Sequence, residues 1–394
     1  MSTSVTDPGG PYARRHDLDA LRIAAFGLLI LYHVGMVFVT WDFHVKSRHA
    51  SQAVEPLMLL LNPWRLTLLF IISGAATRFM SEHMTLKALR RSRSARLLVP
   101  LLFGMLVVVP PQTWAQVQES AGYAGSFWQF WPIYLTGGRP EWHVIMPTYN
   151  HLWFVVYLWL YTMLAVAVWR WLPALERGAD RLLAGPGLWI WPIVVPLVMR
   201  IALFPVFGET HALIDDVWAH AHYGLAFVLG IAIARNTPVW DRLARSWAWT
   251  LGLGLTVYLG WISLRYGPSA MPSGLLRELL WTIGREIFAW LMMAGLFGAA
   301  RRYISRGSPL LSRLTEAVFP FYIIHQTTIV LVAHALRNAG LGAPVEAAIL
   351  IISTALSCAA AYGLALALPI LRLPMGLKPA PASGRLRSGS LARG

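Results

Sequence analysis

Long apolar runs separated by short polar stretches make up most of the chain between residues 21 and 371. A helix needs roughly 20 apolar residues to cross the hydrocarbon core of a bilayer. The pattern predicts about ten such helices, over 21–41, 54–79, 97–114, 151–172, 188–207, 217–234, 247–265, 277–300, 317–336 and 345–371. The expected fold class is therefore all-α, a polytopic membrane helix bundle.

The composition agrees with this fold class. Of the 394 residues, 57% are hydrophobic and 13% are charged, and the mean hydropathy is +0.54. We expect one membrane-bound domain over residues 1–375 and a disordered basic cytoplasmic tail, rich in Pro, Ser, Gly and Arg, over residues 376–394. The first apolar run exceeds the length of a secretory signal core, so we interpret it as a retained signal-anchor helix.

The formal charge of +15 is spread over short loops and does not form one basic domain. This distribution argues against nucleic acid as a partner. Most basic residues fall on one side of the predicted membrane, in the stretches 87–96, 177–181, 235–245, 301–313 and 372–378. The positive-inside rule makes that side cytoplasmic, together with both termini. We expect a multi-pass protein of the cell inner (plasma) membrane, embedded in the lipid bilayer.

Two ionisable residues occupy the first apolar run. Arg22 stands at its start and His33 near its middle, and such groups in hydrocarbon normally face a cavity, a partner or a substrate path. Eleven residues separate them. On an α-helix this spacing puts both side chains within roughly 20° of one face, about 16 Å apart along the axis. One helix face therefore links the membrane edge to the membrane interior.

Further arginines follow. Arg65 lies inside the second run, in RLTLLFIISG, and Arg90, Arg93 and Arg96 share the basic stretch KALRRSRSARLLVP. The i,i+3 spacing of these three lets their guanidinium groups converge on one helical face, an arrangement that suits phosphates. Membrane topology and attraction to anionic lipid also explain the cluster. Arg65 either has a functional role or orders its helix by snorkelling.

Several later polar residues also interrupt apolar runs. His151 and Trp153 belong to HLWFVVYLWLY, His325 to FPFYIIHQTTIVLVAH, and Glu286 follows Arg285 inside another run. An interhelical structural network is the default interpretation of such buried polar residues, and for His151 it is an interfacial histidine. Contact with a substrate is the alternative.

Four of these stretches together resemble the acyltransferase 3 family of integral-membrane O-acyltransferases. They are the arginine, ten residues and histidine of the first helix, then RLTLLFIISG, HLWF and FPFYIIHQ. An Arg-x-x-Arg pair at the start of the third helix is similar to the family as well. WDFHVKS resembles the branch that modifies periplasmic glucans with succinyl groups, although it departs at Asp42, Phe43 and Lys46.

The topology and the resemblance together suggest a mechanism. A basic cytoplasmic cluster, Arg22 at the same edge and His33 deeper in the membrane outline a route from a phosphate-bearing donor to a general base. The resemblance implies an acyl-CoA donor, acetyl-CoA or succinyl-CoA, with no bound cofactor and no metal. It implies an acceptor hydroxyl on an envelope carbohydrate or lipid-linked glycan. The enzyme would transfer acyl groups other than aminoacyl groups.

Each candidate residue then has an expected role. His33 and Arg22 are the catalytic candidates. The donor-binding candidates are Arg65, Arg90, Arg93 and Arg96, and the acceptor-binding candidates are His151, Trp153, Glu286 and His325. A transporter or flippase would place the same buried Arg and His residues along an ion or substrate path. A membrane scaffold or sensor would use them only to hold helices together.

Overall fold

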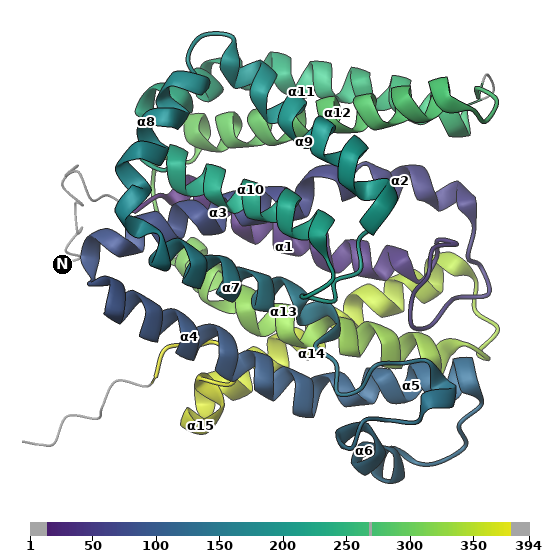
Figure 1. Cartoon of the computed structure of the whole chain (residues 1–394). Coiled ribbons are helices and arrows are strands. Elements are labelled where there is room, and N and C mark those ends of the chain that lie inside the picture. The colour runs from purple at the N-terminus through teal and green to yellow at the C-terminus, as the bar shows by residue number, and fades with distance from the viewer. Residues whose placement is uncertain (1–13, 268–269, 380–394) are drawn as a thin grey trace, which may run out of the picture.

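The computed structural model describes residues 14–267 and 270–379, which are mostly helical and include no strand (Figure 1). Long helices lie side by side across the molecule and form a bundle. The helices are α1 (His16–Met36), α2 (Glu55–Leu59), α3 (Asn62–His83), α4 (Leu86–Phe103), α5 (Val109–Ala121), α6 (Phe127–Leu135), α7 (Trp153–Ala167), α8 (Leu172–Leu182), α9 (Gly187–Phe207), α10 (Val217–Ile233), α11 (Thr237–Tyr266), α12 (Leu275–Tyr303), α13 (Pro309–Leu336), α14 (Ala343–Ala367) and α15 (Pro369–Arg372).

Nine helical stretches in the described part of the chain are long and apolar enough to cross a membrane. The apolar helix α10 has 17 residues and falls just short of that length. The predicted all-α polytopic membrane bundle is therefore confirmed, with about nine spans where the hydropathy pattern suggested about ten.

The third span is longer than its sequence suggested. The chain stays helical from Leu86 to Ala121, although the predicted span covered only 97–114 and Pro110 and Pro111 lie within the stretch. The pair lies in the first turn of α5. Proline at 110 is tolerated because the carbonyl groups that its missing amide would reach, those of Met105 and Leu106, accept hydrogen bonds from side chains of α6 instead.

A π-helical segment, Gly104–Val108, joins α4 to α5. Three of its carbonyl groups accept hydrogen bonds from side chains of other helices, among them the Leu106 carbonyl from the Trp131 indole of α6 at 3.0 Å. The Tyr134 hydroxyl of α6 donates to the Met105 carbonyl at 2.8 Å, and the Thr327 hydroxyl of α13 donates to the Val108 carbonyl at 2.8 Å. These bonds hold the irregular turn in place, because an unpaired backbone carbonyl is costly in a buried position.

Close packing of α3 against α10 forms the centre of the bundle. A Cβ atom on Gly230 would lie 2.0 Å from the Ile71 carbonyl oxygen, and one on Gly74 would lie 2.0 Å from that of Phe227. Glycine at both positions lets the two backbones touch, as small residues do in membrane helix pairs. Both helices line two of the cavities described below.

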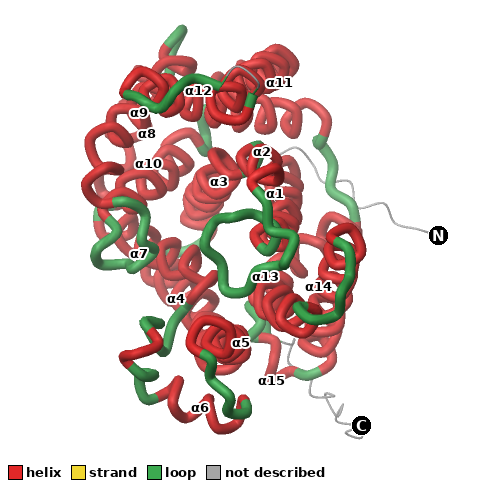
Figure 2. Tube along the Cα trace, turned by 90° about the vertical axis from the view of Figure 1, so that its right-hand side faces the viewer, coloured by secondary structure: helices red, strands yellow, loops and turns green. Residues whose placement is uncertain are grey.

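Both ends of the described chain lie at one end of the bundle. Arg14 and Lys378 line the same cavity there, on the left of Figure 1. Loops 37–51 and 208–216 lie at the opposite end, which faces the viewer in Figure 2. In the predicted tail, Leu377 is buried at 1% exposure, and residues 380–394 lie outside the described residues.

Candidate active site

Basic side chains line a cavity of about 470 Å³ at the end of the bundle that carries both chain ends. We call it the basic cavity. Its charged lining residues are Arg14, Arg22, Arg93, Arg96, Glu316 and Lys378. Five cations and one carboxylate thus face a common space, so the cavity suits a ligand with several negative charges.

Two of these arginines keep unused hydrogen-bond donors. The Nη2 of Arg93 donates to the Thr77 hydroxyl at 2.9 Å, and the Nη2 of Arg22 pairs with Asp19 at 2.8 Å. The Nε atoms of both arginines are buried and have no partner among the described residues. Buried charged donors are stabilised by an anion, so both are available for phosphate oxygens. Arg90 is exposed and does not line this cavity.

A second cavity, of about 750 Å³, lies toward the opposite end, and we call it the histidine chamber. Helices α1, α3, α7, α10 and α13 contribute to its walls, as do loops 37–51 and 208–216. Its polar lining includes Tyr32, His33, His44, Asn62, Arg65, Asn150, His151, Glu209, Tyr223 and Gln326. The chamber is thus rich in neutral hydrogen-bonding groups.

A pair of histidines joins α1 to α13 beside this chamber. The Nδ1 of His33 lies 2.8 Å from the Nε2 of His325, whose own Nδ1 lies 2.7 Å from the Tyr322 carbonyl oxygen. A carbonyl only accepts, so His325 carries its proton on Nδ1 and its Nε2 accepts from His33. The remaining His33 nitrogen, Nε2, is then an unprotonated base, and it has no hydrogen-bond partner in the part of the chain that is described.

His151 is close to this pair but has both ring nitrogens engaged. Its Nε2 lies 3.0 Å from the Ile323 carbonyl oxygen and its Nδ1 lies 3.4 Å from the Gln112 amide nitrogen. The Tyr322 hydroxyl also donates to the His151 carbonyl. His151 therefore ties the start of α7 to α13, and His33 keeps the accessible lone pair.

Arg65 lies in the histidine chamber, apart from the basic cluster with which the sequence analysis grouped it. Its side chain is buried at 3% exposure, and the guanidinium carbon lies 3.9 Å from the centre of the Tyr32 ring. Its Nε and Nη1 have no hydrogen-bond partner among the described residues. A buried guanidinium stabilised mainly by one aromatic face is well suited to bind an anion.

Three aromatic rings separate the two cavities. Phe26, Phe154 and Tyr322 line both the basic cavity and the histidine chamber. The Phe26 ring centre lies 5.4 Å from that of Tyr322 and 6.2 Å from that of Phe154. Phe26 follows Arg22 by one helical turn and precedes His33 by two, so the predicted polar face of α1 runs past the aromatic partition.

The other predicted acceptor residues differ in position. Trp153 lines the chamber, with its ring stacked on His211 at 4.0 Å. Glu286 pairs with Arg285 at 2.5 Å and lines a separate apolar cavity. The structure therefore brings His33, His151, Trp153 and Arg65 to one chamber, with His325 behind His33, and it leaves Glu286 outside.

The functional role of the loop 208–216 was not predicted from the sequence. Its Glu209 lines the chamber and accepts hydrogen bonds from the Tyr223 hydroxyl at 2.8 Å and from His211 at 3.0 Å. Burial opposes its ionisation, but the bond and charge of His211 and the Tyr223 hydroxyl outweigh burial and lower the pKa of Glu209 to about 2. The many ionisable residues of GETHALIDD, which lies between two apolar runs, could have identified this loop as part of a functional site.

The chain is similar in sequence to known proteins. Residues 15–363 match the model of an acyltransferase domain. The glucans biosynthesis protein C of Salmonella gallinarum is 23% identical over 210 residues, which are 52% of this chain and 50% of that protein. The protein of the same name from Escherichia coli K12 is 26% identical over 160 residues, 41% of this chain and 40% of that one. The chain therefore spans half or less of the length of these relatives. No solved structure matches.

Proposed function

The chain belongs to the acyltransferase 3 family of membrane acyltransferases, and from this premise we propose that it moves an acyl group from cytoplasmic acyl-CoA to a hydroxyl of a cell-envelope glycan or glycolipid. The observation that carries the proposal is the alignment of two cavities along α1. The basic cavity holds arginines that can bind phosphate, and the histidine chamber holds the unprotonated Nε2 of His33. Three aromatic rings lie between the two cavities.

Donor binding uses the basic cavity. The phosphates of acyl-CoA bind Arg22, Arg93 and Arg96, because guanidinium groups make charge-assisted bonds to phosphate oxygens. The acyl end passes Phe26 and its partner rings to reach His33. Acyl-CoA is a substrate in this proposal, and the residues described here supply the rest of the chemistry.

His33 acts as general base and then as general acid. Its Nε2 takes the proton of the acceptor hydroxyl while that oxygen forms a bond to the thioester carbonyl carbon. The tetrahedral intermediate collapses, the carbon–sulfur bond breaks, and the leaving thiolate takes the proton back from Nε2. His325 stabilises the protonated His33, because its Nε2 accepts the His33 Nδ1 proton.

Arg65 stabilises negative charge beside His33. The charge is either the oxyanion of the tetrahedral intermediate or the free carboxylate of a succinyl group. Replacing Arg65 with Met distinguishes the two roles. A carboxylate contact predicts that the Michaelis constant rises for succinyl-CoA and changes little for acetyl-CoA. An oxyanion contact predicts an equal loss of kcat with both donors.

The acceptor is proposed to be a glycan. Support comes from the name of the similar proteins, glucans biosynthesis protein C, and from the polar walls of the chamber. Glu209 and Asn150 offer acceptors and donors of the kind that bind sugar hydroxyl groups. The chamber also lies at the end of the bundle opposite both chain ends, as an extracytoplasmic acceptor requires.

Purified protein in liposomes tests the proposal directly. Acyl-CoA and envelope glycan should yield free CoA and a glycan whose mass rises by one acyl group, and His33→Gln should lower the rate of both by about two to four orders of magnitude. Transport of either molecule without CoA release would support a transporter and overturn the proposal. Reporter fusions should place residue 91 in the cytoplasm and the segment 136–139 outside, and the reverse orientation would remove the donor side from the mechanism.

A further inference from the structure

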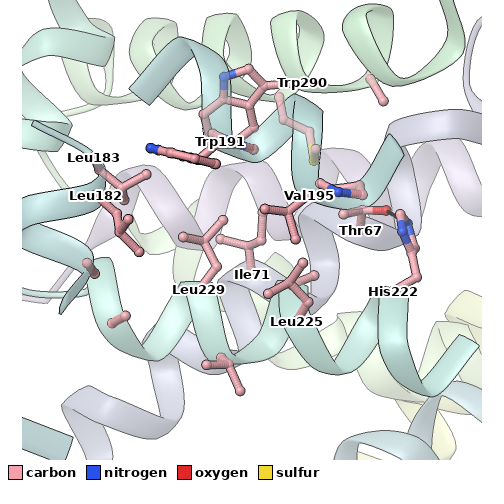
Figure 3. A pocket seen from close by; sticks show the side chains of 18 of the residues that line it. Thr67, Ile71, Leu182, Leu183, Trp191, Val195, His222, Leu225, Leu229 and Trp290 are labelled. Carbon is pink, nitrogen blue, oxygen red and sulfur yellow. Dashed lines mark hydrogen bonds between the residues drawn. The ribbon is translucent and has the colours of Figure 1, made fainter. Parts of the chain in front are cut away.

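A third cavity, separate from the basic cavity and the histidine chamber, lies among α3, α8, α9, α10 and α12 (Figure 3). Its volume is about 280 Å³ and its walls are almost wholly apolar. Leu182 and Leu183 lie at one end, and Thr67 and His222 lie together at the other. A dry apolar cavity of about 150 Å³ holds a benzene ring, so this one has room for a hydrocarbon chain of about a dozen carbons.

The cavity opens sideways because α9 packs loosely on the bundle. Of the residues of α9, only Gly187 and Leu188 are buried. Trp191 of α9 and Val228 of α10 line the cavity and are 43% and 39% exposed. These residues belong to helices of the membrane region, so the opening faces lipid.

The polar end of the cavity holds an unused donor. The Thr67 hydroxyl lies 2.9 Å from the Nε2 of His222, and no other bond of this hydroxyl occurs within the described ranges. If the hydroxyl donates to Nε2, only the Nδ1–H of His222 is left without a partner, whereas the reverse direction would leave both the Thr67 proton and the Nδ1 lone pair unused, so we assign the ring proton of His222 to Nδ1. His222 is 94% buried, with 6% exposure, and its Nδ1 has no hydrogen-bond partner in the described chain. A ligand with an acceptor oxygen would satisfy this donor.

A positive charge lies next to the same end. Arg200 follows Pro196, which lines the cavity, by four residues and so shares its face of α9. Its guanidinium carbon lies 4.2 Å from the Phe204 ring and 5.3 Å from the Trp218 ring, which stacks on His222 at 5.0 Å. Glu286, which lines the cavity, interacts electrostatically with Arg200, but its ion pair is with Arg285, and Arg200 forms no ion pair with a described carboxylate.

We propose that this cavity binds a phosphate-bearing membrane lipid. One hydrocarbon chain fills the space between Leu183 and His222, an oxygen of the lipid accepts from the His222 Nδ1, and the phosphate binds Arg200. The same chemistry is offered by a phospholipid and by a polyprenyl phosphate. The site shares the α3–α10 wall with the histidine chamber, but the inference does not depend on acyl transfer.

Native mass spectrometry of the delipidated full chain tests the proposal. The probes are dioleoylphosphatidylglycerol, a long-chain polyprenyl phosphate, and dioleoylglycerol, which has the same chains as the first without a phosphate. One phosphate lipid should bind per chain, and dioleoylglycerol should bind at least about tenfold more weakly. Competition between the two phosphate lipids identifies which source the site prefers.

Two variants act on different parts of the site. Arg200→Gln removes the phosphate contact, and Leu229→Trp fills the cavity, so each should weaken binding by about tenfold or more. Arg170→Gln and Leu253→Trp are matched controls, because Arg170 stacks on Trp171 at 4.3 Å outside the cavity and Leu253 is 46% exposed on α11. Equal binding by all four variants, or equal binding of dioleoylglycerol, would overturn the proposal.

Discussion

The basic cavity and the histidine chamber share three aromatic rings and otherwise have opposite characters. The basic cavity gathers five cations around one carboxylate, and two of its arginines hold unpaired donors. The chamber holds mainly neutral groups in fixed hydrogen bonds, with Arg65 as its one lining arginine. Excess charge suits recognition of a polyanion, whereas an ordered neutral network suits proton transfer. Variants in the two cavities should therefore affect different kinetic constants.

The largest effect is expected at His33, which tests whether the chamber controls the rate of transfer independently of donor binding. His33→Gln keeps a polar side chain and removes the base, so transfer should fall by about two to four orders of magnitude. The Michaelis constant for acyl-CoA should stay near that of the unmodified protein, because the donor phosphates bind in the other cavity. Initial-rate kinetics in liposomes measure both constants.

The matched control for this variant is His49→Gln. His49 is exposed, its Nε2 binds the Leu341 carbonyl at 2.8 Å, and it does not line the chamber. It should transfer at the native rate. A His33→Gln protein with native kcat would exclude His33 as the base.

His325 should give the next largest effect, because it sets the tautomer of His33. His325→Leu removes the acceptor at 2.8 Å from the His33 Nδ1 and should lower kcat by roughly ten- to a hundredfold, with little change in the Michaelis constant. His325→Gln keeps an acceptor and should recover part of the loss. Equal kcat values for the two variants would show that His325 only fills space.

A smaller and different effect is expected in the basic cavity. Arg93→Gln should raise the Michaelis constant for acyl-CoA by about tenfold, in a salt-sensitive way, with kcat nearly unchanged. Arg90→Gln is the matched control, because Arg90 is exposed outside the cavity. Thr77→Val removes the 2.9 Å bond of Arg93 and keeps its charge. Equal kinetics for Arg90→Gln and Arg93→Gln would show that the arginine cluster sets membrane topology and does not bind the donor.

The smallest effect concerns the loss of stability at acid pH, which depends on a histidine in the hydrogen-bonded network of the chamber. Burial lowers the pKa of His44, although its bonds to Gln116 and Asn150 oppose the shift. The unfolded chain therefore takes up the proton first, and His44 costs stability as the pH falls below about 6.5. Thermal unfolding in detergent between about pH 7.5 and pH 5.5 should show a steeper loss for the native chain than for His44→Asn. Equal slopes would remove His44 from the acid response.

Much of this arrangement could be predicted from the sequence because it is local. Apolar length gave the spans, and the eleven-residue spacing of Arg22 and His33 placed both on one face of α1. The continuation of the third span through Pro110 was not predictable from the proline alone. It depends on side chains from α6 and α13 that bind the carbonyls of the π-helical segment.

The pairing of His33 with His325 is not local. The two residues are 292 positions apart. The hydrophobic periodicity of one helix does not show which other helix it packs against. The sequence showed only that each histidine was costly in an apolar run. For the same reason Arg65 was grouped with the other arginines, although α3 directs it into the chamber while Arg93 of α4 lines the basic cavity.

The π-helical segment has a consequence for the register of the third span. A π turn holds one residue more than an α turn, so it rotates everything after it by about 100° relative to a continuous α-helix. As a result α4 packs on α7, whereas α5 presents Gln112 and Gln116 to His151 and His44. Deleting one residue from Gly104–Val108 would restore the regular α-helix and turn both glutamines away. The one extra residue of this turn therefore determines which side chains of the third span contact the chamber histidines His44 and His151.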